Sequence, residues 1–337
     1  MSDRMASAAA ILLYHQVGEP ASDPFSQYVR SEHFAGHMEV VARRRPVDLL
    51  ELGRDVSRGA AVPGSVAVTF DDGYVSNLRL AKPALERAGV PATVFVTSGM
   101  TGSDRSFWWY ELAEALESAP REAGELRVAC RGGERVWGPQ ADRREVLFEL
   151  WAWLRRSDPA EVVAAVEATR RWAGLGPAGP AADDARCMTI AELHELTDGG
   201  LVGIGAHTRT HPMLSAVTAA RQREEIGGSR ADLEAWLGRA VVSFAYPFGG
   251  RVSEYRSPAV RAVRASGFEV AVAVGSRSVT SSSPILELPR HVAPDVPADE
   301  FAHWLAERLD PPRERRRMLD ARPVRALRER VAPPGRL

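Results

Sequence analysis

The chain has 337 residues, of which 45% are hydrophobic, and its formal net charge at pH 7 is −1. This length suffices for a sizeable core, in one large α/β domain or two smaller domains. The near-zero charge excludes a global electrostatic attraction to nucleic acid or to a membrane surface. The two cysteines, Cys130 and Cys187, lie too far apart in sequence to suggest a disulfide framework, and neither has metal-site spacing.

The N-terminal stretch contains a short apolar run from Ala8 to Tyr14. It is short for the core of a signal peptide, lacks a strongly basic flank and passes directly into an expected strand. No later segment reaches the ~18 apolar residues of a transmembrane helix. We therefore expect no transmembrane segment. We expect a cytoplasmic chain as the sequence stands, or an extracytoplasmic one if an export signal is missing from its N-terminus.

Strand-like and helix-like segments alternate along most of the chain. Extended or strand-like segments are expected at 9–14, 65–70, 91–99, 201–206, 241–247, 269–274 and 285–289. Helices are expected at 31–44, 77–89, 189–200 and 257–267. Gly89 closes the second helix, and Thr189 with Glu192 forms a capping box at the start of the third. The alternation indicates an α/β fold whose parallel sheet or barrel is covered on both faces.

Two regions differ from this pattern. The segment at about 100–188 reads mostly as helix and is rich in tryptophan, with Trp108, Trp109, Trp137, Trp151, Trp153 and Trp172. We expect it to be an insertion in a core domain that spans 1–312. Residues 313–337 form a basic Pro/Arg-rich tail. That tail is either solvated, with a short helix, or in contact with an anionic partner.

Two histidines, His207 and His211, stand four apart in the sequence HTRTH, directly after the expected strand at 201–206. With a carboxylate they would form a two-histidine, one-carboxylate site, which suits zinc and its first-row neighbours. The four-residue spacing alone is weak evidence for a metal site. The alternative is that both histidines belong to an ordinary hydrogen-bonded loop. His33 and His37 have the same spacing, but no strand end precedes them, and we expect both on the surface of a helix.

The sequence VAVTFDDGY ends a buried strand with two adjacent carboxylates, Asp71 and Asp72. Adjacent side chains on a strand point to opposite faces unless the chain turns, and Gly73 permits a turn. The pair either belongs to an ordinary surface turn, in which Asp-Gly is common, or forms part of a site. In such a site one carboxylate would bind a metal and the other would transfer a proton. His15 and Arg290 also lie at expected strand ends. Catalytic groups of parallel barrels gather at this edge.

Three motifs in this order resemble the signature of the NodB-type polysaccharide deacetylases, carbohydrate esterase family four. They are TFDDGY at 69–74, HTRTHP at 207–212 and FAYPFG at 244–249. LLYHQV at 12–17 and LPR at 288–290 are similar to the branch that includes poly-N-acetylglucosamine deacetylases. The resemblance covers roughly 8–100 and 189–310. It implies a distorted (β/α) barrel of about seven parallel strands.

By this resemblance, Asp72, His207 and His211 would hold the metal, and Asp71 would be the general base that deprotonates the attacking water. Thr208 would hydrogen-bond within the loop and separate the two histidines. The metal would be Zn²⁺, with Co²⁺, Ni²⁺ or Fe²⁺ as alternatives.

The third motif would supply the oxyanion contact. The backbone N–H of Phe248 would face the developing charge, while Pro247 and Gly249 shape the turn. Tyr74 and Tyr246 are candidates for contact with the substrate, as are Trp108 and Trp109 in the insertion. Plain packing is the alternative for Tyr246 and the Phe248 side chain, and the core of a small helical lid is the alternative for the two tryptophans.

The sequence departs from the family pattern in two places. Many relatives have an arginine in the third motif that orients the catalytic aspartate, and residues 243–246 contain none. Arg290 is the candidate substitute, and a surface ion pair is the alternative. The late histidine of the family, a general acid, also has no clear equivalent. His15 is the candidate acid, with His291 as the alternative.

Together these residues predict a metal-dependent N-deacetylase that acts on an amino-sugar-containing substrate. The sequence identifies neither the sugar nor the length of the sugar chain. A same-fold hydrolase of a non-sugar amide, such as a cyclic ureide or imide, is the first alternative. A carbohydrate-binding module without turnover is the second. An iron(II) oxygenase is a third, and the ligand spacing does not favour it. No nucleic-acid partner is expected.

Overall fold

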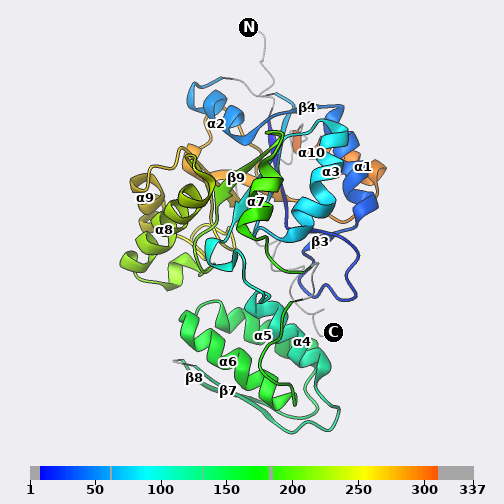
Figure 1. The fold of residues 1–337 in the computed structure, drawn as a ribbon, viewed down its shortest axis with the longest axis vertical. Coiled ribbons are helices and arrows are strands. Elements are labelled where there is room, and N and C mark those ends of the chain that lie inside the picture. Colours follow the sequence, from blue (N-terminus) through cyan, green and yellow to red (C-terminus); the bar gives the residue numbers. More distant parts are fainter. Residues whose placement is uncertain (1–7, 61–62, 131, 182–184, 310–337) are drawn as a thin grey trace. The chain divides into compact units, whose positions relative to one another are not determined.

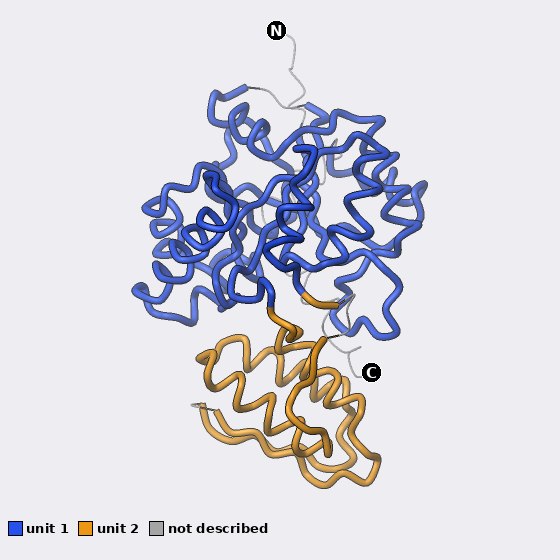
Figure 2. The backbone as a smooth tube through the Cα atoms, in the orientation of Figure 1, with its two compact units in different colours: residues 1–102, 187–324 blue, residues 103–186, 325–337 orange. Residues whose placement is uncertain are grey.

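The computed structural model describes residues 8–60, 63–130, 132–181 and 185–309 (Figure 1). The chain divides into two compact units, which Figure 2 colours separately. Within the described residues, the first unit comprises 8–60, 63–102 and 187–309, and the second comprises 103–130, 132–181 and 185–186. None of the helices in the described ranges has the length and hydropathy that a membrane span requires.

The first unit is built on a closed barrel of seven parallel strands. In barrel order these are β1 (Ala10–Tyr14), β5 (Ser65–Phe70), β6 (Ala92–Val96), β9 (Val202–Ala206), β10 (Ser243–Ala245), β11 (Val270–Val274) and β12 (Leu288–Val292). β12 pairs with β1, and β1 with β5, so the ring closes. The strands are mostly buried apolar residues, as parallel strands covered on both faces require. The predicted barrel of about seven parallel strands is confirmed.

The register of the strands aligns their carboxyl ends. Tyr14 pairs with Phe70, so β1 and β5 end level with each other. Val96 pairs with Ala206, so β6 and β9 also end together. The residues directly after these strands are therefore delivered to one edge of the barrel. They include His15, Asp71 and His207.

Helices surround the barrel. They are α1 (Ser31–Ala42), α2 (Leu49–Ser57), α3 (Lys82–Ala88), α7 (Ile190–Thr197), α8 (Ala219–Leu237), α9 (Ser257–Ala265) and α10 (Ala298–Leu309). Shorter elements are β2 (Gln16–Val17), β3 (Tyr28–Val29), β4 (Arg45–Pro46), the π-helical η1 (Asn77–Ala81), and the 3₁₀ turns η2 (Ser98–Met100), η3 (Leu214–Ala216) and η4 (Ile285–Glu287).

The predicted helix ends are confirmed where the sequence carries specific capping residues. Thr189 and Glu192 form the reciprocal capping box of α7. Gly89 ends α3 in a left-handed conformation with φ 64°. The long helix α8 was not predicted. Its centre contains Gly227 and Gly228, which read as a helix break because glycine costs about 1 kcal/mol in a helix interior.

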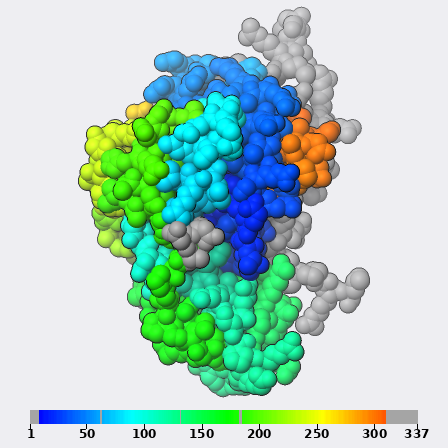
Figure 3. Space-filling model, turned by 45° about the vertical axis from the view of Figure 1, so that its right-hand side comes forward, coloured from blue at the N-terminus to red at the C-terminus, as the bar shows by residue number. Residues whose placement is uncertain are grey.

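The prediction that His33 and His37 both lie on the surface is wrong for His37. Its side chain is fully buried, and its ring stacks on Phe301 of α10 at 3.8 Å. Figure 3 shows α10, in orange, beside the blue α1. His37 stands three residues after the buried Phe34, so it lies on the same apolar stripe of α1. Its two ring nitrogens hydrogen-bond to the Tyr14 hydroxyl and the Val296 carbonyl.

In its described residues, the second unit contains three helices and a hairpin. The elements are α4 (Trp108–Ser118), β7 (Leu126–Cys130), β8 (Gly133–Trp137), α5 (Arg143–Leu154) and α6 (Pro159–Trp172). The prediction of a mostly helical insertion missed the antiparallel β7–β8 pair. β7 alternates buried and exposed residues in the period of a half-covered strand. The tail predicted at 313–337 lies outside the described residues.

Candidate metal centre and active site

Three side chains converge at the carboxyl edge of the barrel, one from the loop after β5 and two from the loop after β9. Asp72 Oδ1 lies 3.7 Å from His207 Nε2 and 3.5 Å from His211 Nε2. One ligand atom from each residue lies within 4.8 Å of the others. Ligand atoms at zinc-bond distances of a tetrahedral ion are themselves roughly 3.4 Å apart. The spacing is therefore suited to one divalent cation.

The loops that carry these three residues adopt left-handed backbone conformations, which residues other than glycine rarely do. φ is 75° at Asp72, 65° at Thr208 and 56° at His211. The turn expected at Gly73 thus begins one residue earlier, at Asp72, and continues through Gly73 with φ 80°. This turn sends the adjacent carboxylates of Asp71 and Asp72 to different partners. Strain of this kind persists only where the surrounding structure holds it, and it is concentrated at functional sites.

The two imidazoles have the protonation state of metal ligands. His207 Nδ1 hydrogen-bonds to the Ala245 carbonyl at 2.8 Å, so the lone pair of Nε2 is directed toward Asp72. Burial lowers the pKa of His207. Burial and the neighbouring His207 lower the pKa of His211 well below its usual value. Both rings are therefore neutral at neutral pH, which is the form that binds a metal.

Asp72 supplies the strongest indication that a cation fits here. The residue is 2% exposed, and within the described residues its Oδ1 has no hydrogen-bond partner. Burial and the charge of Asp71 raise the pKa of Asp72 well above its usual value, against a smaller opposing contribution from a hydrogen bond with Tyr74. A buried carboxylate is costly to ionise unless a positive charge lies beside it. A divalent cation between this oxygen and the two imidazole nitrogens would supply that charge.

Asp71 is held by Arg290. The guanidinium donates one hydrogen bond to each carboxylate oxygen, both at 2.7 Å, and a further one to the Thr69 hydroxyl at 3.2 Å. Burial raises the pKa of Asp71, but the charge of Arg290 and its hydrogen bonds outweigh this effect and lower the pKa to about 2. Arg290 has no exposed surface, so this pair is not the surface ion pair considered as an alternative.

The two candidate acids differ in where their side chains point. His15 follows β1 at the same edge, and burial lowers its pKa to about 4, against the opposing charge of Asp71. His291 lies beside Arg290 on β12, and successive strand side chains point to opposite faces. Because Arg290 contacts Asp71, His291 points the other way, and its ring packs against Trp304 of α10 at 6.2 Å. The structure therefore brings His15, and not His291, toward Asp71.

The residues of the third motif form a tight turn next to the proposed metal ligand His211. Phe248 has φ 60°, and its ring lies 4.8 Å from the His211 ring. The buried Pro247 precedes it. Tyr246 is fully buried, donates its hydroxyl hydrogen to the Leu286 carbonyl at 3.0 Å and stacks on Tyr255 at 3.9 Å. These contacts give the Tyr246 side chain a place in the core.

The remaining aromatic candidates lie in different surroundings. Tyr74 is fully buried beside the metal ligands, and its backbone pairs with that of Cys187. Trp108 and Trp109 belong to α4 of the second unit, where Trp109 is 2% exposed and stacks on Phe107 with ring centroids 4.5 Å apart. Contact of these residues with substrate stays a prediction.

Sequence analysis missed two residues that support the site. Thr69 accepts the third hydrogen bond of Arg290 and donates its own to the Leu12 carbonyl at 2.7 Å. Thr69 lies two residues before Asp71 and therefore on the same face of the strand. This spacing could have identified it from the sequence as a neighbour of Asp71. Glu225 on α8 contacts the loop between the two histidines. No pattern around Glu225 indicated this, because α8 itself was not predicted.

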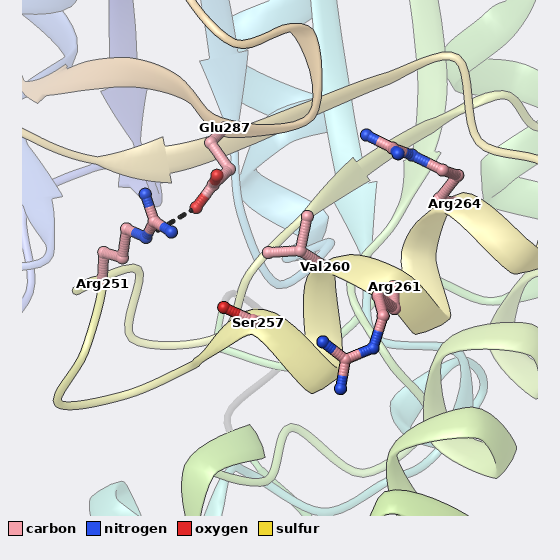
Figure 4. Close-up of a pocket in the computed structure, with 6 residues that line it drawn as sticks. All are labelled: Arg251, Ser257, Val260, Arg261, Arg264 and Glu287. Atoms are coloured by element: carbon pink, nitrogen blue, oxygen red, sulfur yellow. Dashed lines mark ion pairs between the residues drawn. The ribbon is translucent and has the colours of Figure 1, made fainter.

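A separate cavity of about 130 Å³ lies against α9 (Figure 4). It is lined by Arg251, Ser257, Val260, Arg261, Arg264 and Glu287. The Nε of Arg251 pairs with Glu287 at 3.0 Å. The lining comes from α9, the loop before it and η4, and it includes none of the metal ligands. This cavity is not the site described above.

Residues 58–125 and 179–271 match the family model described as polysaccharide deacetylase. Over these two ranges the chain contains a polysaccharide deacetylase domain. The matched ranges include all three proposed ligands and Asp71, and they skip most of the second unit. No curated protein matches the sequence.

Several solved structures share the fold. The Streptococcus pyogenes deacetylase PplD, in complex with acetate, is 16% identical with a TM-score of 0.58, over 90% of this chain and 99% of that one. IcaB from Ammonifex degensii is 19% identical with a TM-score of 0.57, over 89% and 97%. A de-N-acetylase from Aggregatibacter actinomycetemcomitans is 14% identical with a TM-score of 0.52, over 88% and 99%. At these identities the similarity is one of fold.

Proposed function

We propose that this deacetylase is metal-dependent and removes N-acetyl groups from an amino-sugar-containing substrate, which is a polysaccharide, an oligosaccharide or a glycoconjugate precursor. The observation that carries the proposal is the convergence of Asp72 Oδ1 with the Nε2 atoms of His207 and His211, beside an ionised Asp71. Two nitrogens and one carboxylate oxygen suit Zn²⁺, with Co²⁺, Ni²⁺ or Fe²⁺ as alternatives. When bound, the ion would supply a Lewis acid that polarises an amide carbonyl and lowers the pKa of a water molecule.

In the proposed reaction, Asp71 takes a proton from the water that attacks the acetamido carbonyl. Its low pKa keeps the base form available across the working pH range, while Arg290 fixes the direction of its oxygens. A carboxylate with a low pKa is a weak base. A bound ion would compensate for this by lowering the pKa of the attacking water. The backbone N–H of Phe248 would stabilise the oxyanion of the tetrahedral intermediate.

His15 would protonate the leaving nitrogen as the carbon–nitrogen bond breaks. Its pKa of about 4 means that the ring is neutral in the resting protein. The proton that Asp71 takes from the attacking water would therefore pass to His15, whose electrostatic neighbours include Asp71, and from His15 to the leaving nitrogen. The products are acetate and the amine in its protonated form, so atoms and charge balance with water as the only co-reactant.

The choice of an acetamido sugar rests on the family and on the relatives described above, one of which is a de-N-acetylase and another a complex with acetate. A non-sugar amide hydrolase and a binding module without turnover are the competing functions. Acetate release from N-acetylglucosamine monomers and oligomers, with Zn²⁺ supplied or chelated, distinguishes them. Zinc-dependent acetate release supports the proposal. Bound metal with no acetate from any sugar would overturn the substrate class.

A further inference from the structure

A buried carboxylate on α8 contacts the loop that carries both proposed histidine ligands. Glu225 has no exposed surface. Its Oε2 accepts hydrogen bonds from the backbone N–H groups of Arg209 at 2.9 Å and Thr210 at 2.8 Å. Its Oε1 accepts the hydroxyl hydrogen of Thr210 at 2.6 Å. Arg209 and Thr210 lie between His207 and His211, so one side chain binds the centre of the ligand loop.

These contacts go beyond what a buried helix residue needs for packing. A carboxylate without exposed surface is costly unless its oxygens are fully hydrogen-bonded. On its own helix, Glu225 is paired only with Arg221, one turn earlier, at 2.8 Å. The other three donors all come from the ligand loop. Hydrogen bonds from N–H groups to a carboxylate are roughly twice as strong as those between neutral groups.

The other side of the loop is held by the turn that follows β6. The N–H of Ser98 donates to the Thr208 carbonyl at 3.1 Å, and that of Gly99 donates to the Arg209 carbonyl at 2.8 Å. A Cβ at Gly99 would lie 2.5 Å from the Arg209 oxygen, so only glycine fits this approach. The loop is thus held from two elements in a conformation with left-handed φ at Thr208 and His211.

We propose that Glu225 is a positioning residue for the divalent cation. By fixing the backbone at Arg209 and Thr210, it keeps the strained residues on either side in the conformation that brings both imidazoles to Asp72. This inference rests on the proposed metal site. Residues that orient metal ligands typically contribute about 10–100-fold to metal affinity.

The test is Zn²⁺ and Co²⁺ affinity of the full chain, measured by calorimetry after metal removal, with acetate release at increasing metal. For Glu225→Ala we expect the Kd to rise about 10–100-fold. Its kcat should recover to within about threefold at saturating metal, because no reacting group has been removed. For Glu225→Gln we expect a Kd within about threefold of wild type, because the amide oxygen can accept both backbone hydrogens and the amide NH2 can donate to Thr210 Oγ1. Arg221 loses its partner on Glu225 in this variant, but its side chain is 35% exposed and keeps its pair with Glu224.

Glu224→Ala is the matched control, since Glu224 is the exposed neighbour of Glu225 and also pairs with Arg221, at 2.9 Å. We expect its Kd to stay at the wild-type value. If Glu225→Ala does not fold, Thr210→Val carries the test, because it removes one of the three hydrogen bonds, with an expected rise in Kd of about threefold to tenfold.

A wild-type Kd in Glu225→Ala, or in Thr210→Val if that variant carries the test, would overturn the inference. So would a Glu225→Gln variant as weak as Glu225→Ala. A wild-type chain that binds no metal would instead contradict the proposed metal site itself. A wild-type chain that binds metal and releases no acetate would contradict the proposed reaction and leave the Glu225 test valid.

Discussion

Arg290 and Asp71 form a bidentate ion pair inside the barrel, with both hydrogen bonds at 2.7 Å and almost no exposed surface on either side chain. The pair joins the first and last parts of the chain, because β12 closes the barrel onto β1 and β1 pairs with β5. Its electrostatic consequence is an aspartate that stays ionised down to a pH of about 2. In the proposed mechanism the base has to be ionised and held in one orientation, and Arg290 would do both for Asp71.

Replacing Arg290 should therefore damage stability and turnover together. In Arg290→Met the Asp71 carboxylate stays buried without its partner, and we expect a loss of about 3–5 kcal/mol in the free energy of unfolding. Urea denaturation measures this loss. The control is Arg251→Met, which removes an exposed arginine from its pair with Glu287 and should cost no more than about 1 kcal/mol. Equal effects of the two substitutions would argue against a special role for Arg290.

His15 should affect turnover and leave metal binding in place. We expect His15→Gln to lower kcat by about 10²–10⁴-fold, the usual contribution of a general acid, with a metal Kd close to wild type. His291→Gln is the control, because His291 packs against Trp304. Its kcat should remain within about threefold of wild type. A larger loss in His291→Gln than in His15→Gln would reverse the assignment.

The stability of the metal-free protein should fall as the pH drops from 6.5 to 4. Burial lowers the pKa of His15, His37 and His291 to about 4, so in this interval the unfolded chain binds protons that the folded chain does not. Each such histidine contributes a slope of up to about 1.4 kcal/mol per pH unit, with stability rising as pH rises. Denaturation of His37→Gln across this range should show a shallower slope than wild type. An unchanged slope would contradict the assignment of His37 as a buried neutral ring.

Much of the barrel could be predicted from the sequence, because fully buried parallel strands leave long apolar runs whose ends carry polar residues. Asp71 and His207 follow such runs directly.

The contacts of Arg290 and Glu225 could not be predicted in the same way. Arg290 reaches Asp71 only because β12 closes the ring, more than 200 residues away in sequence. Glu225 is one of several acids on a polar helix with two internal glycines, and nothing in its neighbours distinguishes it from Glu224. His37 was misplaced because a polar residue at a core position cannot be told from a surface residue without its partners.

Metal removal should lower the thermal stability of the wild-type protein and leave Asp72→Asn unaffected. Free Zn²⁺ at 100 times its Kd stabilises the folded state by about 2.7 kcal/mol if it does not bind the unfolded chain. Asp72→Asn loses the carboxylate ligand and its unfavourable buried charge, so we expect a metal-free Tm at or above that of wild type. Thermal denaturation with and without chelator measures both effects. A chelator-induced drop in Tm of Asp72→Asn equal to that of wild type would place the metal elsewhere.

In the proposed mechanism Asp72 binds the metal and the adjacent Asp71 acts as the base, and one comparison separates these two roles. Metal content and acetate release from N-acetylglucosamine oligomers would be measured side by side for wild type and Asp71→Asn. We expect about one ion per chain in both proteins, with acetate released at a rate at least about 100-fold lower by Asp71→Asn. Loss of the metal from Asp71→Asn, or acetate release at the wild-type rate, would contradict it.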